Sequence, residues 1–416
     1  MTEKLGHRKR LMGERALLML CATAALLCSL NASASDAEQA LRAELAKGLS
    51  KGLPSISVAI ASRQGVIWTG AVGYANLESR SRAHAGYLYG IGSITKMFVA
   101  CVIEELADEG KLNLDATPRD ILGDHVVGGI PNADRATIRE LLNHSSGIPT
   151  WEFDTQWIRR GRGAELSPSH IWGKSETLQY LRGGRHPATN EPGAGYAYSN
   201  SNYTILGLIV EKITGADVLA AIHDRILTPL TLRDIRLEGF ETVDAERLPA
   251  RYQFGTAEFL RDAGMSRYFH KVQGGLLDVT QSNLSTEWTA GGIVATAHDL
   301  ALFAQALRDG KVVGQAALRR MLDFRATDDP NEQAGQGIFR DRYGTETLIG
   351  YTGNVLGFGA AVGWLEHEDM VLVVMTNVGA MHAGGSAYYP EKLLKDTQLI
   401  RRARELAREL APRRAP

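Results

Sequence analysis

Apolar residues follow two different periods along the chain, and each period is concentrated in particular regions. Continuous or alternating apolar runs, which are typical of strands, occupy residues 55–73, 347–354, 358–365 and 370–378. The first run is long enough for two strands that turn near Gly65, and the charged residues between the last two runs favour a hairpin. Because the runs lie near both ends of the chain, we expect one sheet built from both ends.

Residues spaced for one face of a helix occupy most of the remaining chain. The helix expected to begin at Ser93 and to end at Gly110 is apolar on most sides, so we expect it deep inside the fold. Other helices are predicted over 37–52, 137–144, 200–215, 217–230, 296–310 and 391–410. Between about 115 and 285 the pattern is mainly helical with long loops. The expected fold is therefore α/β of the α+β type, with this region as a helical insertion.

Residues 1–34 differ in character from the rest of the chain. Basic residues precede an apolar stretch at 16–30, and Ala32-Ser33-Ala34 then fits a small-residue cleavage site. This order predicts a secretory signal peptide, and the stretch is shorter than the ~20 residues that span a bilayer. We therefore expect a periplasmic or secreted protein without a membrane span in the mature chain, with an uncleaved anchor as the alternative. The predicted folded domain covers 35–400, and a charged tail covers 401–416.

Composition and charge narrow the classes of partner. The chain of 416 residues has a formal net charge of −1, which offers no field for nucleic acid or for anionic membranes. Two of the three cysteines lie inside the predicted signal, so the mature chain would keep only Cys101 and form no internal disulfide. The sequence has no His-Glu-x-x-His or comparable ligand cluster, so we expect neither a metal nor another cofactor.

Ser93 and Lys96 are the first candidates for chemistry. They form the only Ser-x-x-Lys in the chain, and Ser93 follows a Gly-x-Gly turn at the start of the apolar helix. An offset of three residues places the hydroxyl and the amine on the same helical face, within side-chain reach. The backbone N–H groups at a helix N-terminus also favour negative charge there. A polar first turn without further meaning is the alternative.

Two further segments carry candidate site residues. Tyr198 and Asn200 lie two residues apart just before a predicted helix, so both side chains can project from one loop. Gly353, in the segment "IGYTGN", lies on a strand that we expect at a sheet edge, where a glycine lets an acyl group approach the backbone closely. Each segment alone is a weak signal, and the informative feature is their order and spacing.

The three segments together resemble the penicillin-recognising serine hydrolases, which include class C β-lactamases, DD-peptidases and related esterases. The matching residues are Ser93, Lys96, Tyr198, Asn200, Thr352 and Gly353. Similar recurring segments are "LLNHSSGIP" at 141–149, "YSNSNYTILGLIVEKITG" at 198–215 and "GGIVATAHDLALFAQAL" at 291–307. The resemblance covers nearly all of residues 40–380. It implies a β-lactamase/transpeptidase-like fold: an antiparallel sheet flanked by helices, a mainly helical second region, and a catalytic cleft between them.

The resemblance also implies a catalytic role for three residues. Ser93 would attack a carbonyl carbon and form an acyl-enzyme. Lys96, with a lowered amine pKa, could take the proton of Ser93, and Tyr198 as a phenolate could take it instead. Both bases stay open at this point. Tyr198 would also relay a proton to the leaving group.

Other residues would bind the substrate, which we expect to be a small molecule or a peptide. Asn200 would orient the lysine amine and contact the acyl side chain. The backbone N–H of Asn354, together with that of the nucleophile, would form an oxyanion hole. Tyr351, Thr352 and Gly353 would complete this wall of the cleft.

Tyr351 departs from the family pattern. The family usually has Lys or His directly before the Thr-Gly pair, where a cation helps hold the free carboxylate of a β-lactam or of a D-alanyl-D-alanine end. Tyrosine is uncharged at neutral pH, and losing a charge-assisted hydrogen bond costs about 1.5–3 kcal/mol, or roughly ten- to a hundredfold in recognition. We therefore expect an amide or ester hydrolase of the β-lactamase or D-alanyl-D-alanine carboxypeptidase type that favours substrates without that carboxylate. A nearby arginine that replaces the charge is the alternative.

Two other interpretations of the chain remain. A carboxylesterase on the same scaffold fits Tyr351, whereas a non-catalytic binding protein would have no physical reason to retain all of the matching residues. His144 resembles a triad base, but a loop histidine with hydrogen-bonded neighbours is expected because the lysine or the tyrosine already supplies a base.

The missing cation predicts a substrate preference. We expect the protein to hydrolyse a short acyl ester faster than a chromogenic cephalosporin, because only the cephalosporin carries the free carboxylate. Comparing kcat/KM for the two substrates measures this preference, and faster turnover of the cephalosporin would contradict it.

Overall fold

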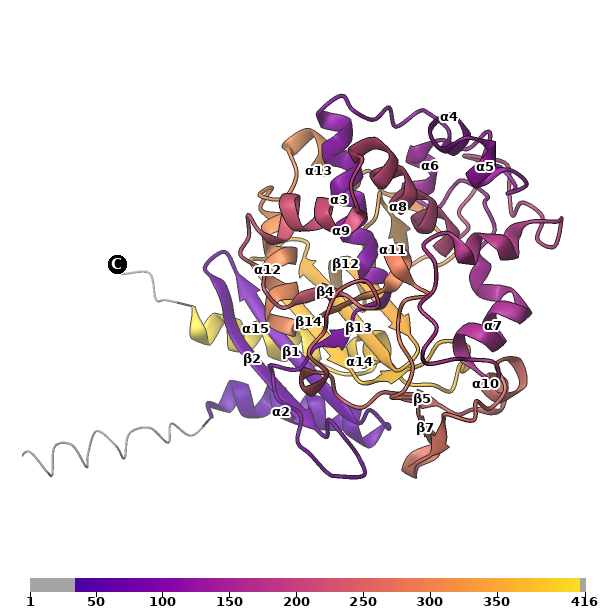
Figure 1. Ribbon diagram of the computed structural model, residues 1–416. Coiled ribbons are helices and arrows are strands. Elements are labelled where there is room, and N and C mark those ends of the chain that lie inside the picture. Colours follow the sequence, from indigo (N-terminus) through magenta and orange to yellow (C-terminus); the bar gives the residue numbers. More distant parts are fainter. Residues whose placement is uncertain (1–33, 412–416) are drawn as a thin grey trace, which may run out of the picture.

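The computed structural model describes residues 34–411, which form a large antiparallel sheet with helices on both faces and a helical region beside it (Figure 1). The predicted signal peptide lies outside the described residues except for Ala34, as does the end of the predicted tail, 412–416. In spatial order, the strands of the large sheet are β2 (Gly65–Gly73), β1 (Ser55–Ser62), β14 (Val371–Thr376), β13 (Phe358–Leu365), β12 (Glu346–Val355), β11 (Phe339–Tyr343), β10 (Glu332–Ala334) and β9 (Arg325–Ala326). The predicted sheet built from both ends of the chain is therefore confirmed.

Both faces of the sheet are buried, which explains why its central strands are continuously apolar. One face packs against α2 (Asp36–Ser50), α14 (Pro390–Asp396) and α15 (Leu399–Leu410), and the other packs against α12 (Ala297–Arg308). Along β14, Val371 and Val373 join the core on the α12 side, whereas Leu372 and Val374 join the core on the α2 side. A strand buried on both faces needs apolar residues at every position.

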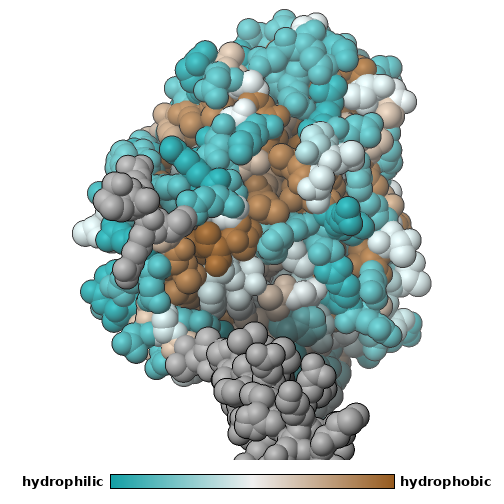
Figure 2. Space-filling model, turned by 90° about the vertical axis from the view of Figure 1, so that its left-hand side faces the viewer, coloured by the Kyte–Doolittle hydropathy of each residue, from teal (hydrophilic) through white to brown (hydrophobic). Residues whose placement is uncertain are grey.

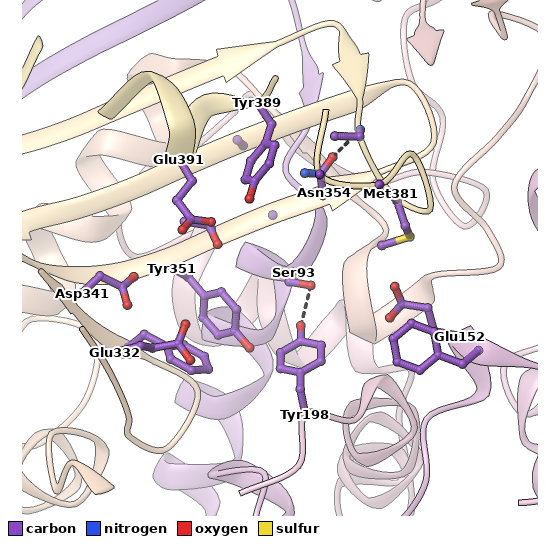
Figure 3. Close-up of a pocket in the computed structure, with 18 of the residues that line it drawn as sticks. Ser93, Glu152, Tyr198, Glu332, Asp341, Tyr351, Asn354, Met381, Tyr389 and Glu391 are labelled. Carbon is purple, nitrogen blue, oxygen red and sulfur yellow. Dashed lines mark hydrogen bonds between the residues drawn. The ribbon is translucent and has the colours of Figure 1, made fainter. Parts of the chain in front are cut away.

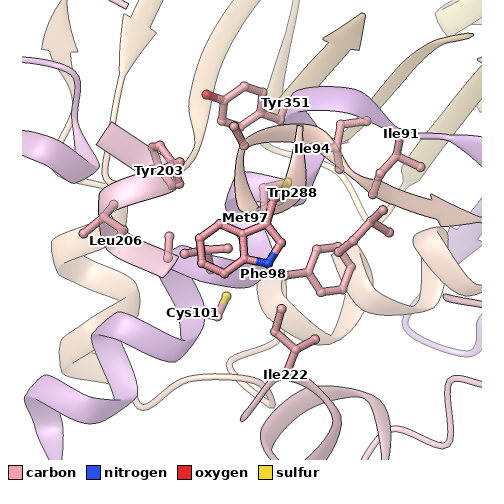
Figure 4. Packing of buried hydrophobic residues seen from close by; sticks show 14 of the residues in the cluster. Ile91, Ile94, Met97, Phe98, Cys101, Tyr203, Leu206, Ile222, Trp288 and Tyr351 are labelled. Atoms are coloured by element: carbon pink, nitrogen blue, oxygen red, sulfur yellow. The ribbon is translucent and has the colours of Figure 1, made fainter. Parts of the chain in front are cut away.

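The helical region surrounds one buried helix, α3. Its helices are α3 (Thr95–Asp108), α4 (Pro118–Leu122), α5 (Asp124–Val127), α6 (Ile138–Leu142), α7 (Thr155–Arg162), α8 (Asn200–Thr214), α9 (Val218–Ile222), α10 (Ala257–Asp262), α11 (Trp288–Gly291) and α13 (Gln315–Met321). Eleven of the fourteen residues of α3 are buried. Figure 4 shows its side chains Met97, Phe98 and Cys101 in contact with the surrounding core near Leu206 of α8 and Trp288 of α11. The predicted deep position of this helix is thus confirmed.

The structure corrects several predicted boundaries. Between 115 and 285 the chain also contributes strands to two small sheets. The first sheet has the order β15 (Val378–Gly379), β5 (Tyr252–Phe254), β7 (Leu276–Asp278) and β6 (His270–Lys271). The second has the order β3 (Tyr89–Gly90), β8 (Ile293–Ala295) and β4 (Ile235–Leu237). Strands β9 to β11 were not predicted, because these outer strands are half-exposed and mostly polar. The helix predicted over 391–410 is divided into α14 and α15. The domain end predicted at residue 400 falls inside α15, whose Ala403 and Leu406 are buried in the core, so this part of the tail belongs to the domain.

Few large hydrophobic side chains are exposed on the described surface. Large hydrophobic side chains that are exposed among the described residues are Phe153, Ile171, Met265 and Leu410. Figure 2 shows one face, with hydrophilic residues over most of its rim and hydrophobic residues toward its centre. No helix within 34–411 combines the length and the apolar character needed to cross a bilayer.

A close contact between β12 and the turn before α3 joins the sheet to the helical region. From Tyr351 onward β12 pairs only with β13 among the described strands, so its other edge faces the short 3₁₀ turn η1 (Gly92–Ile94). A Cβ atom at Gly353 would lie 1.9 Å from the carbonyl oxygen of Ile91, and one at Gly92 would lie 2.7 Å from the backbone nitrogen of Asn354. The two backbones can therefore approach this closely only because both residues are glycine.

Replacing Gly353 by alanine tests this contact. We expect Gly353→Ala to lower the free energy of unfolding by about 1–3 kcal/mol, since the added methyl group forces the strand away from the turn. The control is Gly195→Ala, at an exposed position where a Cβ atom would meet no atom within 4 Å. Urea unfolding of both variants measures the difference, and equal stabilities would contradict the proposed constraint.

Candidate active site

The Lys96 amine is enclosed at the bottom of the site. The side chain is 0% exposed, and its Nζ lies 2.7 Å from Oδ1 of Asn200 and 2.6 Å from the carbonyl oxygen of Ala290 in α11. Burial lowers the pKa of the Lys96 ammonium well below its usual range, although the nearby carboxylates of Glu152 and Glu287 oppose the shift. The structure thus brings the predicted Lys96 and Asn200 together.

Ser93 lies between Lys96 and Tyr198. The Lys96 Nζ is 3.0 Å from the Ser93 Oγ, and the Tyr198 hydroxyl donates to the same Oγ at 2.7 Å. Ser93 belongs to the turn η1 rather than to α3 itself and is half-buried, so its hydroxyl is accessible from the cavity above it. Burial raises the pKa of the Tyr198 phenol above its usual range, which disfavours the phenolate.

The hydrogen-bond partners of the lysine identify where its lone pair can point. The Asn200 amide oxygen and the Ala290 carbonyl oxygen can only accept, so each takes one N–H of the amine. A neutral amine has two N–H groups and one lone pair. With both hydrogens used, the lone pair of a neutral Lys96 faces the Ser93 hydroxyl.

A buried ion pair lies behind the lysine. Arg162 and Glu287 are 1% and 2% exposed and form a salt bridge with each other. Glu287 directly precedes α11, whose Ala290 carbonyl oxygen contacts Lys96. The ion pair therefore lies where it can hold α11 against the site, and the sequence had not indicated either residue.

Tyr351, Thr352, Gly353 and Asn354 all line one wall of the cavity, as predicted for the end of β12. The Tyr351 side chain is buried, and its hydroxyl points toward that of Tyr198 (Figure 3). The backbone nitrogens of Ser93 and Asn354 flank the close contact at Gly353. The side chain of Asn354 points elsewhere, since its Oδ1 accepts from the backbone N–H of Ala380 at 2.8 Å.

The cavity above Ser93 has a volume of about 550 Å³ and is strongly acidic. Glu332, Asp341 and Glu391 lie together on the side of Tyr351, and Glu152 lies on the opposite side (Figure 3). Within the described chain, no lysine, arginine or histidine lines this cavity. The arginine considered as a replacement for the missing cation is thus not part of its lining.

The two acidic sides differ in their surroundings. Glu152 is 8% exposed and accepts a hydrogen bond from the Asn200 amide nitrogen, and burial raises the pKa of its carboxyl. On the other side, burial, reinforced by Glu332 and Glu391, raises the pKa of Asp341 to about 8. A cation bound in the cavity would offset both effects, because it stabilises the ionised carboxylates.

Sequence reasoning missed these four carboxylates for different reasons. Glu152 stands between Trp151 and Phe153 in the sequence, and an acidic residue among large aromatic residues is the one available signal. Glu332 and Asp341 lie on the unpredicted strands β10 and β11. Glu391 lies in the first turn of α14, whose charged residues suggested a solvent-exposed face.

Comparison with known proteins identifies relatives of the chain in structure and in sequence. A D-amino acid amidase from Ochrobactrum anthropi SV3, solved in complex with L-phenylalanine amide, is similar in structure with a TM-score of 0.77 and 26% identity, over 90% of this chain and 100% of the amidase. Esterase EstB of Burkholderia gladioli is 30% identical over 214 residues, which are 49% of this chain and 52% of the esterase. A protein of Escherichia coli (strain K12), whose name provisionally assigns it as a D-alanyl-D-alanine carboxypeptidase, is 28% identical over 209 residues.

The match to the two sequence relatives is partial, since it covers 52% of the esterase and 45% of the Escherichia coli protein. The match to the family model is more extensive. The model described as Beta-lactamase matches residues 35–394, which include every predicted site residue. The family and the fold predicted from the sequence are therefore confirmed, and the chain belongs to the beta-lactamase family of serine hydrolases.

Proposed function

We propose that the protein hydrolyses amides or esters through an acyl-enzyme formed on Ser93, with Lys96 as the base. The observation that carries this proposal is the position of the Ser93 hydroxyl, which lies within hydrogen-bond distance of both the Lys96 amine and the Tyr198 phenol at the bottom of an open cavity. A non-catalytic binding protein would not need this arrangement.

In the acylation step, the Ser93 oxygen attacks the substrate carbonyl carbon while its proton passes to the lone pair of neutral Lys96. The carbonyl electron pair moves to oxygen, where the backbone N–H groups of Ser93 and Asn354 would stabilise the negative charge. Lys96 is favoured over Tyr198 as the base because burial lowers the pKa of the lysine and raises that of the tyrosine.

Collapse of the tetrahedral intermediate breaks the bond to the leaving nitrogen or oxygen. That atom takes a proton from the Tyr198 hydroxyl, and the proton held by Lys96 restores the phenol. Water then adds to the acyl-enzyme ester, gives up a proton to the same pair of groups, and releases the acid with Ser93 regenerated. No other co-reactant is needed.

The charge of the cavity supports a substrate that carries an amino group and no free carboxylate. Four carboxyl groups and no cationic side chain of the described chain line the space above Ser93. Glu152 is linked to the reacting groups through Asn200. The amide nitrogen of Asn200 donates to Glu152, and its amide oxygen accepts from Lys96. An ammonium group on the acyl side of the substrate would bind there. The similarity to the D-amino acid amidase, solved with L-phenylalanine amide, is consistent with this substrate class.

The same electrostatics disfavour two activities of the family, the hydrolysis of β-lactams and of peptides that end in D-alanyl-D-alanine. A β-lactam or a peptide ending in D-alanyl-D-alanine would place its carboxylate beside Tyr351, where burial would remove its water and no cation would compensate. An esterase function fits better, and the 30% identity to EstB supports it as the second candidate. We also propose export of the protein, which rests on the signal-like order of residues 1–34.

Loss of the nucleophile tests the mechanism. We expect Ser93→Ala to abolish labelling by a fluorophosphonate probe, and Lys96→Met to reduce kcat by about 10²–10⁴-fold, because the general base is missing. A fluorescent penicillin, applied in parallel, should label the wild type more weakly than the fluorophosphonate does. Circular dichroism checks that both variants are folded. Label that persists on Ser93→Ala would assign the nucleophile to another residue.

Amine recognition is tested with phenylalanine amide and its N-acetylated form, each as both enantiomers. We expect the wild type to hydrolyse the free amine faster, and Glu152→Gln to raise KM for it by roughly ten- to a hundredfold, since one charge-assisted hydrogen bond is lost. The variant keeps an oxygen that accepts from Asn200. The matched variant Glu332→Gln removes a charge from the opposite side and should have a smaller effect. Equal rates for the free and the acetylated amide would contradict amine recognition.

A further inference from the structure

His144 lies beside the site, two residues after the end of α6, and the proposed mechanism does not use it. The side chain is fully buried, and its ring stacks on that of Tyr198 with centroids 4.4 Å apart and an angle of 26° between the planes. Its Nδ1 accepts the backbone N–H of Ser199 at 3.1 Å, and its Nε2 lies 3.3 Å from the hydroxyl of Tyr351. Burial lowers the pKa of the imidazole well below its usual range, so the ring is neutral.

The contact with Ser199 determines which ring nitrogen carries the proton. A backbone N–H can only donate, so Nδ1 must be the unprotonated nitrogen of the neutral ring. The proton is therefore on Nε2, which donates to the oxygen of Tyr351. The single O–H of Tyr351 is then free to donate to the hydroxyl of Tyr198, toward which it points (Figure 3).

The same reasoning continues to the nucleophile. Tyr198 uses its own single O–H to donate to the Ser93 Oγ at 2.7 Å, which leaves its oxygen lone pairs to accept from Tyr351. Both phenols keep their protons because burial raises their pKa values. Since Ser93 accepts from Tyr198, its own hydrogen is available for the lone pair of Lys96, 3.0 Å away.

We infer that His144 and Tyr351 are positioning residues, which orient a one-way chain of hydrogen bonds from the Ser199 N–H through Tyr198 so that the Ser93 proton points to Lys96. This inference rests on the proposed function. It also gives Tyr351 a task other than holding a carboxylate. The tyrosine that replaces the expected cation supplies one acceptor and one donor at the middle of this hydrogen-bond chain.

Removing the Tyr351 hydroxyl tests the hydrogen-bond chain with little change in the shape of the side chain. We expect Tyr351→Phe to lower kcat for phenylalanine amide about tenfold or more and to change KM less than about threefold. Without the chain, the Ser93 hydrogen can turn toward Tyr198, and neutral Lys96 loses a hydrogen bond. The apparent pKa of Lys96 should therefore rise, and the acidic limb of the kcat/KM profile should move to higher pH. The other titratable groups that face Lys96 are unchanged: Glu152, Glu287, His144, Tyr198 and Tyr203.

Variants of His144 and Tyr203 separate orientation from packing. His144→Phe removes both polar contacts, and His144→Gln should recover most of the lost kcat because an amide can accept from Ser199 and donate to Tyr351. Tyr203→Phe removes a buried hydroxyl that donates to the Leu142 carbonyl oxygen and takes no part in the hydrogen-bond chain. It should lower the thermal midpoint without moving the acidic limb. If His144→Phe does not fold, Tyr351→Phe alone decides the kinetic test.

A readout independent of activity distinguishes this inference from the proposed function. With ¹⁵N-histidine labelling, we expect NMR to show His144 as the Nε2–H tautomer, with its signals assigned by their absence in His144→Gln. An Nδ1–H tautomer, or wild-type kcat and pH profile in Tyr351→Phe, would overturn the inference. Activity that survives in Ser93→Ala would instead refute the proposed function. The NMR assignment of the His144 tautomer would still test the hydrogen-bond chain in that case.

Discussion

The burial of one amine is the constraint on which the site depends. Lys96 lies in the first turn of a helix that the core encloses, and an ammonium group there loses its hydration. Two oxygen atoms, from Asn200 and Ala290, accept its N–H groups, so a neutral amine remains satisfied and its lone pair is left for Ser93. The same burial that penalises the charge thus leaves a neutral amine, the base that we propose, beside a hydroxyl group.

The approach of β12 to the turn η1 brings the end of this strand to the cavity above Ser93, which we propose as the substrate pocket. Glycine at positions 92 and 353 lets the two backbones meet, which brings the amides of Ser93 and Asn354 to one place. The strand then continues along a cavity whose lining includes carboxylates and no cationic side chain of the described chain. The scaffold of the family is therefore combined with an electrostatic environment that favours a cationic substrate and opposes a carboxylate.

Most of the proposed reactive set could be predicted from the sequence because its members fall in two pairs of close neighbours along the chain and because these motifs resemble those of a known family. The spacing of Ser93 and Lys96 follows from helix geometry, and Tyr198 and Asn200 share one loop. The acidic lining could not be predicted in the same way. Asp341 and Glu391 come from polar segments that have no apolar pattern, and they meet only in the folded chain, where β11 and α14 both contribute to the lining of one cavity.

The sequence by itself indicated the family, the sheet built from both chain ends, the buried helix and the residues that we propose as the nucleophile and its neighbours. The family follows from the resemblance of the motifs, and the other properties depend on local spacing and on apolar periodicity, which a single chain displays directly. Tertiary structure alone decided which atoms contact Lys96, where His144 points, and which charges surround the substrate. Those properties depend on backbone carbonyls and on polar side chains from distant segments, and their effect on a pKa or on a hydrogen-bond direction exists only after burial removes water.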